Sequence, residues 1–203
     1  MTREQERELV QKAQEGDSES FEKLVIDNQT KVYNLALRMV GNEDDAFDMA
    51  QESFLRAYNS LSSFRGDSRF SVWLYRLTTN ICLDFLRSES RRSHSSLTYM
   101  GEGEDDKELE IPDERFSPEL IAEKNELRQE VRGALMSLPE DYRVILLLRE
   151  INGLSYEEIG SCLSLEAGTV KSRIFRARKK LCSILSDEGN LSGSSSSNKA
   201  KGV

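Results

Sequence analysis

The chain has 203 residues and a formal net charge of -8, from 28 lysine and arginine residues against 36 aspartates and glutamates. This acidic excess excludes a generally basic nucleic-acid coat protein, so any nucleic-acid contact must be local. The longest aliphatic run, 144–148, is too short to cross a bilayer, and the N-terminus lacks an apolar signal-peptide core. We therefore expect a cytoplasmic protein with no membrane insertion and one or two small domains.

The cysteine and histidine residues form no disulfide or metal pattern. Cys82, Cys162 and Cys182 are odd in number, widely spaced and set in apolar helical sequence, so we expect three small buried hydrophobic residues. The single histidine, His94, lies in a segment without periodicity, and no catalytic constellation is visible. The sequence therefore predicts no enzyme, no metal site and no cofactor.

Two amphipathic helices are expected near the N-terminus, where strand signals are nearly absent. Asp17 or Ser18 can cap the first helix, which continues to Met39. Gly41-Asn42 breaks that helix, and Asn42 caps the second helix, which covers 43–61. Carboxylates form an acidic ridge along the second helix at Asp45, Asp48 and Glu52. A ridge of this kind is usually just a solvated helix face.

A polar loop over 62–69 follows, and a third helix is expected over about 71–87. The aromatic residues Phe70, Trp73 and Tyr75 have a spacing that is common in helical cores. For Trp73 the sequence leaves both core packing and a contact with a ligand open.

Helical periodicity disappears between His94 and Phe116, where acidic residues alternate with glycine, which is typical of a linker. It resumes at Ser117, with Pro118 at the first helical position. Leu138-Pro139 separates that helix from the next one.

The strongest pattern in the chain is the basic segment 168–181. Residues 166–182 contain six cations and one anion, Glu166. At about 100° per residue a single buried stripe is predicted, consisting of Val170, Ile174, Ala177 and Leu181. Phe175 falls opposite this stripe, where a thymine methyl in a major groove would give the exposed ring a partner.

A second short helix is expected directly before the basic one. Ser155 and Glu158 form a capping box after an Asn152-Gly153 turn, and Ser164 can cap the basic helix across a tight connection. Two short helices with this connection make a helix-turn-helix pattern. The alternative is an ordinary surface helix with a solvated charge run, and the excess of cations counts against it.

We therefore expect an all-α fold with two small helical domains joined by a flexible acidic linker, the C-terminal domain containing the helix-turn-helix. The expected parts are an N-terminal domain over 1–92, a linker over 93–116, a C-terminal domain over 117–187 and a disordered serine-rich tail over 188–203.

The chain resembles the extracytoplasmic-function (ECF, group four) sigma factors of the bacterial sigma-70 family. The resemblance covers about 15–92 and 117–186 and rests on four ordered stretches: DAFDMAQESFLRAY at 45–58, FRGDSRFSVWLYR at 64–76, Leu138-Pro139, and GLSYEEIG at 153–160 with the basic helix. It implies a subunit that binds core RNA polymerase, directs it to promoter DNA through the -35 and -10 elements, and promotes DNA opening. It also admits an anti-sigma factor as a further partner.

Site residues carried over from the resemblance fall into three groups. Core polymerase would contact Asp45, Asp48, Gln51, Glu52, Leu55 and Arg56. The -10 element would contact Phe64, Arg65, Gly66, Asp67, Ser68, Arg69, Trp73, Asn80, Asp84 and Arg87. The -35 element would contact Thr169, Lys171, Ser172, Arg173, Phe175, Arg176, Arg178 and Lys179.

The sequence departs from the usual family pattern at Phe47, where an acid is common, and at Ala50, where a larger aliphatic residue is common. Phe47 can be a core residue or an additional interface residue. A second reading of the whole chain is a stand-alone helix-turn-helix regulator that binds duplex DNA without polymerase.

Overall fold

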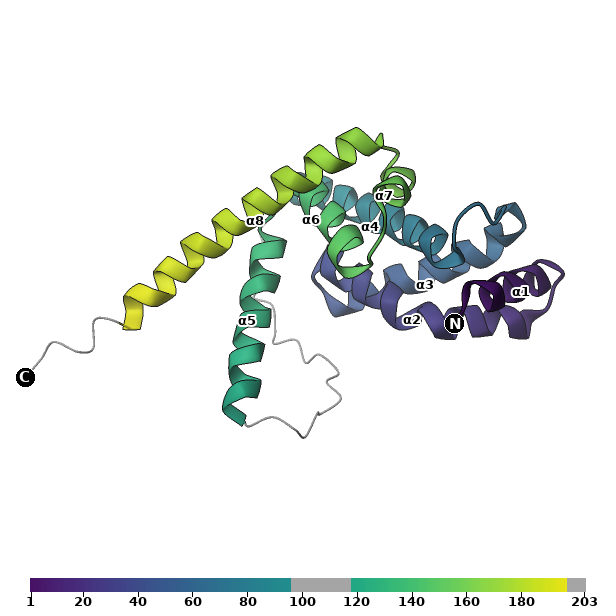
Figure 1. Cartoon of the computed structure of the whole chain (residues 1–203), viewed down its shortest axis with the longest axis horizontal. Coiled ribbons are helices and arrows are strands. Elements are labelled where there is room, and N and C mark those ends of the chain that lie inside the picture. The colour runs from purple at the N-terminus through teal and green to yellow at the C-terminus, as the bar shows by residue number, and fades with distance from the viewer. Residues whose placement is uncertain (96–117, 197–203) are drawn as a thin grey trace, which may run out of the picture.

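A computed structural model of the chain describes the backbone of residues 1–95 and 118–196 and the side chains of residues 1–92 and 126–186. Every regular element in these ranges is a helix, which confirms the expected all-α class (Figure 1). The N-terminal unit contains α1 (Arg3–Gln14), α2 (Ser18–Val40), α3 (Glu43–Ser60), the short 3-10 turn η1 (Leu61–Ser63) and α4 (Phe70–Ser95). The C-terminal unit contains α5 (Pro118–Met136), α6 (Glu140–Leu146), the π-helical turn η2 (Leu147–Ile151), α7 (Tyr156–Leu163) and α8 (Ala167–Ser196).

Local capping chemistry sets the ends of α2 and α3. The side chains of Asp17 and Asn42 each accept a hydrogen bond from the first turn of the helix that follows, at 3.1 and 3.0 Å. Gly41 ends α2 with a φ of +84°, and a Cβ there would lie 2.5 Å from the Met136 methyl group. The positive φ therefore requires glycine at this position, whereas the flexible end of the Met136 side chain could move to relieve the contact.

Helix α1 is an addition to the elements predicted from the sequence. It begins with a capping box in which Thr2 and Gln5 exchange side-chain to main-chain hydrogen bonds of 3.0 and 3.3 Å. Val10 from α1 joins the apolar core of the N-terminal unit. The other buried members of that core are Leu24, Val32, Ala50, Ala57, Leu61, Phe70, Trp73 and Leu74.

The predicted capping box of the helix-turn-helix is present at the start of α7. The Ser155 hydroxyl accepts from the Glu158 N–H at 3.1 Å, and the Glu158 carboxylate accepts from the Ser155 N–H at 2.8 Å. The turn after α7 brings the backbone of Leu165 close to Gly160. A Cβ at Gly160 would come within 2.6 Å of the Leu165 carbonyl oxygen, so only glycine fits there without a shift. The expected stripe residues Val170, Ile174 and Ala177 are buried in the core of this unit.

The structure corrects the role expected for Ser164. It ends α7 in the left-handed conformation, with φ +55°, and α8 begins only at Ala167. Ser164 therefore supplies the reversal between the two helices rather than the cap of the second. A residue with positive φ is needed there because the tight turn brings the Leu165 N–H back to the Gly160 carbonyl at 2.9 Å.

Three further expectations differ from the structure. Helix α4 continues to Ser95, and α8 continues to Ser196 into the segment expected as a disordered tail. Extending an existing helix avoids the cost of nucleation, which favours these longer ends. Cys82 and Cys162 are buried as expected, but Cys182 is exposed on α8. The rest of the expected linker, 96–116, and the last seven residues lie outside the described part of the chain.

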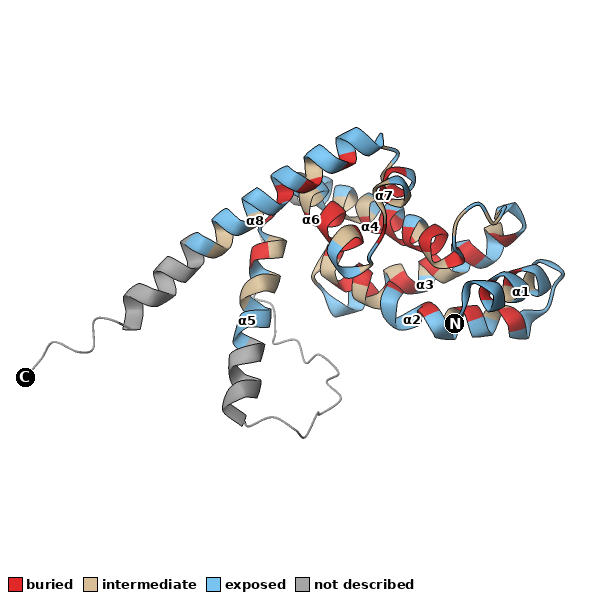
Figure 2. Ribbon diagram, in the orientation of Figure 1, coloured by how far each residue is buried: buried red, intermediate tan, exposed pale blue. Residues whose placement is uncertain are grey.

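The two units pack against each other. Apolar residues of α2 and α4 share one buried cluster with residues of α6, α7 and α8 (Figure 2). At this contact Cys162 Sγ of α7 lies 3.7 Å from the Val72 carbonyl oxygen of α4. The long helix α8 runs along the outside of the molecule, with its buried residues on the side facing α6 and α7 (Figures 1 and 2).

Candidate nucleic-acid interface

The N-terminal half of α8 presents an aromatic ring and cations to solvent. Phe175 is 70% exposed, whereas Ile174 beside it is 2% exposed, so the helix has the two faces that its sequence predicts. Thr169, Lys171, Ser172 and Arg176 are also exposed. The arrangement can place one aromatic and several hydrogen-bond donors against the edges of base pairs.

Two of the predicted -35 residues are held by carboxylates of the same unit. Arg178 donates from Nε to Glu150 at 3.0 Å with a second, shorter bond from Nη2, and Glu150 thereby raises the pKa of Arg178. Arg173 lies 3.7 Å from Asp141 of α6. In the described part of the chain no ion pair is formed by Lys171, Arg176 or Lys179, which leaves these three available for DNA.

The second candidate surface is the segment 64–69 between η1 and α4, which we call the -10 loop. Its Arg65, Asp67 and Arg69 are exposed, and Gly66 has a φ of +76° that favours glycine. Phe64 closes the loop over the core, with its ring centroid 5.0 Å from that of Trp73.

Trp73 itself is only 7% exposed and packs between Phe64 and Phe70. Of the two roles that the sequence leaves open for it, core packing is the one it has in this arrangement. A direct contact with DNA would require the Phe64 ring to move. The indole of Trp73 therefore supports the -10 loop by packing under the Phe64 ring, on the side of the core.

Helix α4 continues the surface of the -10 loop with polar side chains. Asn80, Asp84 and Arg87 are exposed, and Asp84 pairs with Arg87 at 3.3 Å. An exposed amide and a guanidinium on one helix can contact base edges and phosphates.

A third candidate surface lies on α3 and suits a protein partner better than DNA. Leu55 is 55% exposed, and Phe47 and Tyr58 are exposed to a similar degree. Beside them Asp48 and Gln51 are exposed and Glu52 pairs with Arg56 at 2.6 Å. Partial burial raises the pKa of Asp45, and neighbouring carboxylates add to that rise. Exposed apolar residues flanked by acids are typical of a protein interface.

Tyr58 is not among the contact residues expected from the sequence, and for Phe47 both a core and an interface role were open. The sequence contains a pattern that could have identified both residues. Positions 47 and 58 lie at helical spacing from the predicted contact residues at 51 and 55, so all four share one face of α3. The exposure of Phe47 excludes the core role, and a contact with a partner stays a prediction.

The helix-turn-helix lies against the -10 loop in this arrangement. Arg69 Nη2 is 3.7 Å from the Glu158 carboxylate of α7, and a cavity of about 280 Å³ between the units is lined by Trp73 and Arg76 of α4 and Glu157 of α7. One side of the -10 loop is therefore covered by the C-terminal unit.

Comparison with known proteins places these surfaces in a family. The family model for Sigma-70 region 2 matches residues 24–92, and the model for Sigma-70, region 4 matches residues 128–181. The ECF RNA polymerase sigma-E factor of Salmonella typhimurium is 44% identical over 173 residues, which are 85% of this chain and 90% of that protein. The chain belongs to the ECF sigma factors. The RNA polymerase sigma-H factor of Pseudomonas aeruginosa is 39% identical over 181 residues, 89% of this chain and 94% of that protein.

Two solved structures share the fold of this sigma factor. CnrH in complex with the cytosolic domain of CnrY superposes with a TM-score of 0.66 at 26% identity, over 90% of this chain and 98% of that chain. The sigma factor RpoE of Bartonella quintana, in complex with the anti-sigma factor NepR, gives a TM-score of 0.66 at 25% identity, over 82% and 96%.

The two matched regions divide the candidate surfaces of this sigma factor between them. Region 2 includes α3, the -10 loop and most of α4, and region 4 includes α6, η2, α7 and the basic half of α8. Helix α1 precedes the region 2 match. Within the described residues, no helix combines the length and apolar character of a membrane span, and no group of potential metal ligands comes together.

Proposed function

We propose that this sigma factor binds core RNA polymerase in the cytoplasm, directs it to promoters through their -35 and -10 elements, and promotes opening of the DNA. The observation that carries the proposal is the presence, on one chain, of two separate surfaces suited to DNA and a third suited to a protein. We propose in addition that the chain acts by binding alone and catalyses no reaction.

The exposed half of α8 is proposed to read the -35 element. Phe175 offers an apolar contact for a thymine methyl, and Arg176 offers a guanidinium that can pair with guanine O6 and N7. Lys171 and Lys179 suit flanking phosphates. Arg173 and Arg178 contribute by holding α8 to the carboxylates of α6 and η2, which supports the orientation of the reading helix.

The -10 loop and α4 are proposed to hold the opened strand. Strand opening needs cations and hydrogen-bonding groups that trap unpaired bases, and Arg65, Asp67 and Arg69 lie exposed on the loop for this purpose. Asn80 and Arg87 on α4 lie along the continuation of the same path. Trp73 is assigned a supporting role under Phe64.

The exposed face of α3 is proposed as the contact with core polymerase. Leu55 supplies apolar area, while Asp48 and Glu52 supply charges that steer the encounter and fix the register. An anti-sigma factor is a further proposed partner, because the similar sigma factor RpoE was solved in complex with the anti-sigma factor NepR.

The proposal is tested by adding the purified chain to core RNA polymerase and mapping transcripts from total genomic DNA. We expect a small set of new start sites that share two sequence elements at constant spacing. A stand-alone regulator would instead bind duplex DNA without core and would create no start sites. That outcome would overturn the proposal.

A further inference from the structure

A basic cavity of about 390 Å³ lies where α2, the start of α4 and the end of η2 meet. Both units therefore contribute to its walls. Its cations are Lys31 and Arg38 of α2 and Arg69 of the -10 loop. The other lining residues supply amides, hydroxyl groups and a small apolar area: Asn34, Leu35, Ser71, Tyr75, Ile151 and Asn152.

The α2 side of the cavity is a polar stripe along one helix face. Lys31, Asn34 and Arg38 lie on this face, because positions three, four and seven apart are neighbours on an α-helix. Lys31 and Arg38 are seven positions apart, roughly 10 Å along the helix axis. Arg38 Nη1 donates to the Asn34 carbonyl oxygen at 3.3 Å, which holds the guanidinium along the helix. The stripe therefore presents two separated positive charges with an amide between them.

The charges of this stripe are not neutralised within the described part of the chain, where neither Lys31 nor Arg38 forms an ion pair. Asp27, one turn before Lys31 on α2, pairs with the N-terminal ammonium group at 3.6 Å. Arg69 lies 3.7 Å from the Glu158 carboxylate, and no carboxylate is among the described residues that line the cavity. A recess lined by charges of one sign attracts an ion of the opposite sign, so this cavity suits an anion.

Hydrogen-bond donors extend the positive lining on the α4 side. Tyr75 is buried, and burial raises the pKa of its hydroxyl, which therefore stays protonated and can donate. Ser71 lies one turn before Tyr75 on α4. Asn152 of the C-terminal unit lies within hydrogen-bonding reach of the Tyr75 hydroxyl, so the donors of the two units meet at this point.

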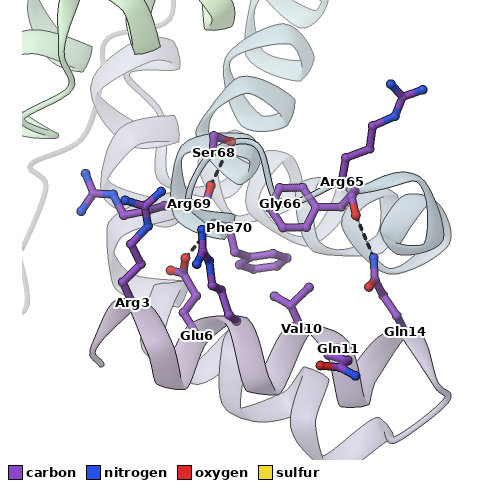
Figure 3. A pocket seen from close by; sticks show the side chains of 12 residues that line it. Arg3, Glu6, Val10, Gln11, Gln14, Arg65, Gly66, Ser68, Arg69 and Phe70 are labelled. Atoms are coloured by element: carbon purple, nitrogen blue, oxygen red, sulfur yellow. Dashed lines mark hydrogen bonds between the residues drawn. The ribbon is translucent and has the colours of Figure 1, made fainter.

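The start of α4 is held in place by α1. Glu6 Oε1 of α1 accepts from the Phe70 N–H at 2.8 Å (Figure 3). Gln14 Nε2 donates to two main-chain carbonyl oxygens at and just before the start of the -10 loop, both at 2.8 Å. Arg69 and Ser71, on either side of Phe70, therefore project from a backbone that is fixed at both ends of the loop. A fixed backbone lowers the entropy lost when a ligand orders these side chains.

We propose that this cavity binds a small anion that carries two or more phosphate groups. Its volume lies within the range of small-molecule sites. Arg38 and Arg69 offer guanidinium groups that pair with phosphate oxygens through two hydrogen bonds each, and Lys31 adds a point charge. A chain of phosphate groups can bridge the two ends of the α2 stripe. Inorganic oligophosphate and the phosphate chain of a nucleotide share this chemistry, and the test below distinguishes the two sources.

Such a ligand stabilises the packed arrangement of the two units. Ile151 and Asn152 reach the cavity from the C-terminal unit, so separation of the units removes part of the site. By linkage, a ligand that prefers the packed arrangement weakens the binding of any partner that holds the units apart. The binding site itself does not depend on the proposed function, whereas this effect on core polymerase rests on it.

Calorimetric titration of the full chain with inorganic tripolyphosphate, in buffer free of divalent cations, tests the site. We expect affinity roughly tenfold higher than for orthophosphate, because several charged contacts replace one. Lys31→Ala is expected to weaken tripolyphosphate binding about tenfold, through loss of one charged hydrogen bond. Lys23→Ala is the matched control and should leave the affinity unchanged, because Lys23 is also an exposed lysine of α2 but does not line the cavity.

The effect on polymerase is measured by the binding of the full chain to core polymerase. At a tripolyphosphate concentration about ten times the dissociation constant, core binding is expected to weaken about tenfold, because the ligand binds only the packed arrangement. Lys31→Ala should reduce this effect to about twofold at the same concentration. A direct action of tripolyphosphate on core polymerase would be equal for both chains, and equal weakening would overturn the coupling to unit packing.

Adenosine triphosphate distinguishes the two sources of the ligand. An affinity equal to or below that of tripolyphosphate assigns the site to inorganic oligophosphate, and a higher affinity assigns it to a nucleotide.

The inference is overturned if tripolyphosphate binds no more tightly than orthophosphate, or if Lys31→Ala behaves like Lys23→Ala. It is also overturned if the free chain binds neither anion while Lys31→Ala lowers the salt dependence of promoter binding by holoenzyme, because the stripe would then contact DNA phosphates. A wild-type chain that fails to bind core polymerase would contradict the proposed function, and the calorimetric titration would still decide whether the site exists.

Discussion

Neighbouring cations on α8 have different surroundings, and this difference divides their roles. Arg178 is committed to Glu150, whereas Arg176 forms no ion pair with any residue that the structure describes. The carboxylate that holds Arg178 lies 28 residues earlier in the chain, so the excess of cations in the sequence could not distinguish the two arginines. We therefore expect Arg176 to read a base and Arg178 to support the helix.

Replacing Arg176 tests this division. Arg176→Ala removes one bidentate donor and is expected to cost about 1–3 kcal/mol of discrimination, or roughly fivefold to 150-fold in transcription from a preferred promoter. Binding to core polymerase should stay unchanged, as measured by competition with a labelled sigma factor.

Arg178→Ala serves as the control at the same charge. It should relax the orientation of α8 and lower activity at matched and mismatched -35 sequences alike, without changing the preferred base. Equal loss of base preference in both variants would argue against a reading role specific to Arg176.

The three cysteines differ in reactivity according to their burial. Burial raises the pKa of the Cys82 and Cys162 thiols from 9.0 to about 12, and Cys182 is exposed. A thiol reagent at pH 8 should modify one cysteine rapidly in the folded chain and all three after unfolding, because the reactive species is the thiolate.

The same pKa rise predicts the behaviour at alkaline pH. Above pH 9 the unfolded chain loses thiol protons that the folded chain keeps, so the free energy of unfolding should fall as pH rises toward 12. Urea unfolding at pH 8 and pH 10, compared with a Cys82→Ala variant, measures the contribution of that thiol. An identical decrease in the two proteins would contradict this origin.

At the scale of single elements, α3 combines an apolar stripe with charges, and each part makes its own prediction. Glu52→Lys reverses a charge beside Arg56, and we expect about tenfold weaker core binding with slower association. Leu55→Ala should also weaken core binding about tenfold, mainly through faster dissociation. Both are measured by association and dissociation kinetics with core polymerase.

Glu22→Lys on α2 is a suitable control, because the residue is exposed and belongs to a different helix. If Glu22→Lys weakened core binding as much as Glu52→Lys does, the loss of affinity would reflect the net charge of the chain. It would then be no evidence that α3 contacts core polymerase.

The first helix of the helix-turn-helix depends on its capping box. Ser155→Ala removes the acceptor for the Glu158 N–H and is expected to lower the free energy of unfolding by about 1 kcal/mol. Ser161→Ala, at an exposed position within α7, should change the free energy of unfolding by at most a few tenths of the loss expected for Ser155→Ala. Urea unfolding of the two variants measures the difference, and similar losses would show that the cap contributes little.

Elements whose limits depend on local chemistry could be predicted from the sequence. The caps at Asp17, Asn42 and Ser155 and the stripe through Val170 and Ile174 depend on residues within a few positions of each other. Features that depend on distant partners could not. Helix α1 is fixed by groups 47 to 64 residues away.

The burial of Trp73 likewise follows from packing rather than from its own spacing. Its contacts with Phe64 and Phe70 form only when the -10 loop folds back over the core. The left-handed conformation of Ser164 could not be predicted either, because the close approach of Gly160 and Leu165 imposes it.

At the scale of the whole molecule, the packing of the two units must change when both promoter elements are bound. Helix α7 covers one side of the -10 loop through Glu158 and Arg69, and Cys162 lies against the Val72 carbonyl of α4. A -35 reader and a -10 reader on one DNA need separate positions along the duplex. Core polymerase is expected to hold the units apart.

Cys162 reports this separation. Its thiol should be protected in the free chain and become reactive in holoenzyme, as measured by mass spectrometry after brief alkylation. Cys182, which is exposed on α8, should be reactive in both states and serves as the reference. Unchanged protection of Cys162 in holoenzyme would mean that the contact between α4 and α7 persists on the polymerase.

We expect this chain to open promoter DNA only as a subunit of polymerase. Permanganate footprinting of a mapped promoter, with the chain alone, core alone and the two together, tests it most directly. We predict reactive thymines in the -10 region only when both proteins are present. Reactive thymines with the chain alone, or a stable duplex footprint that core does not change, would contradict the account.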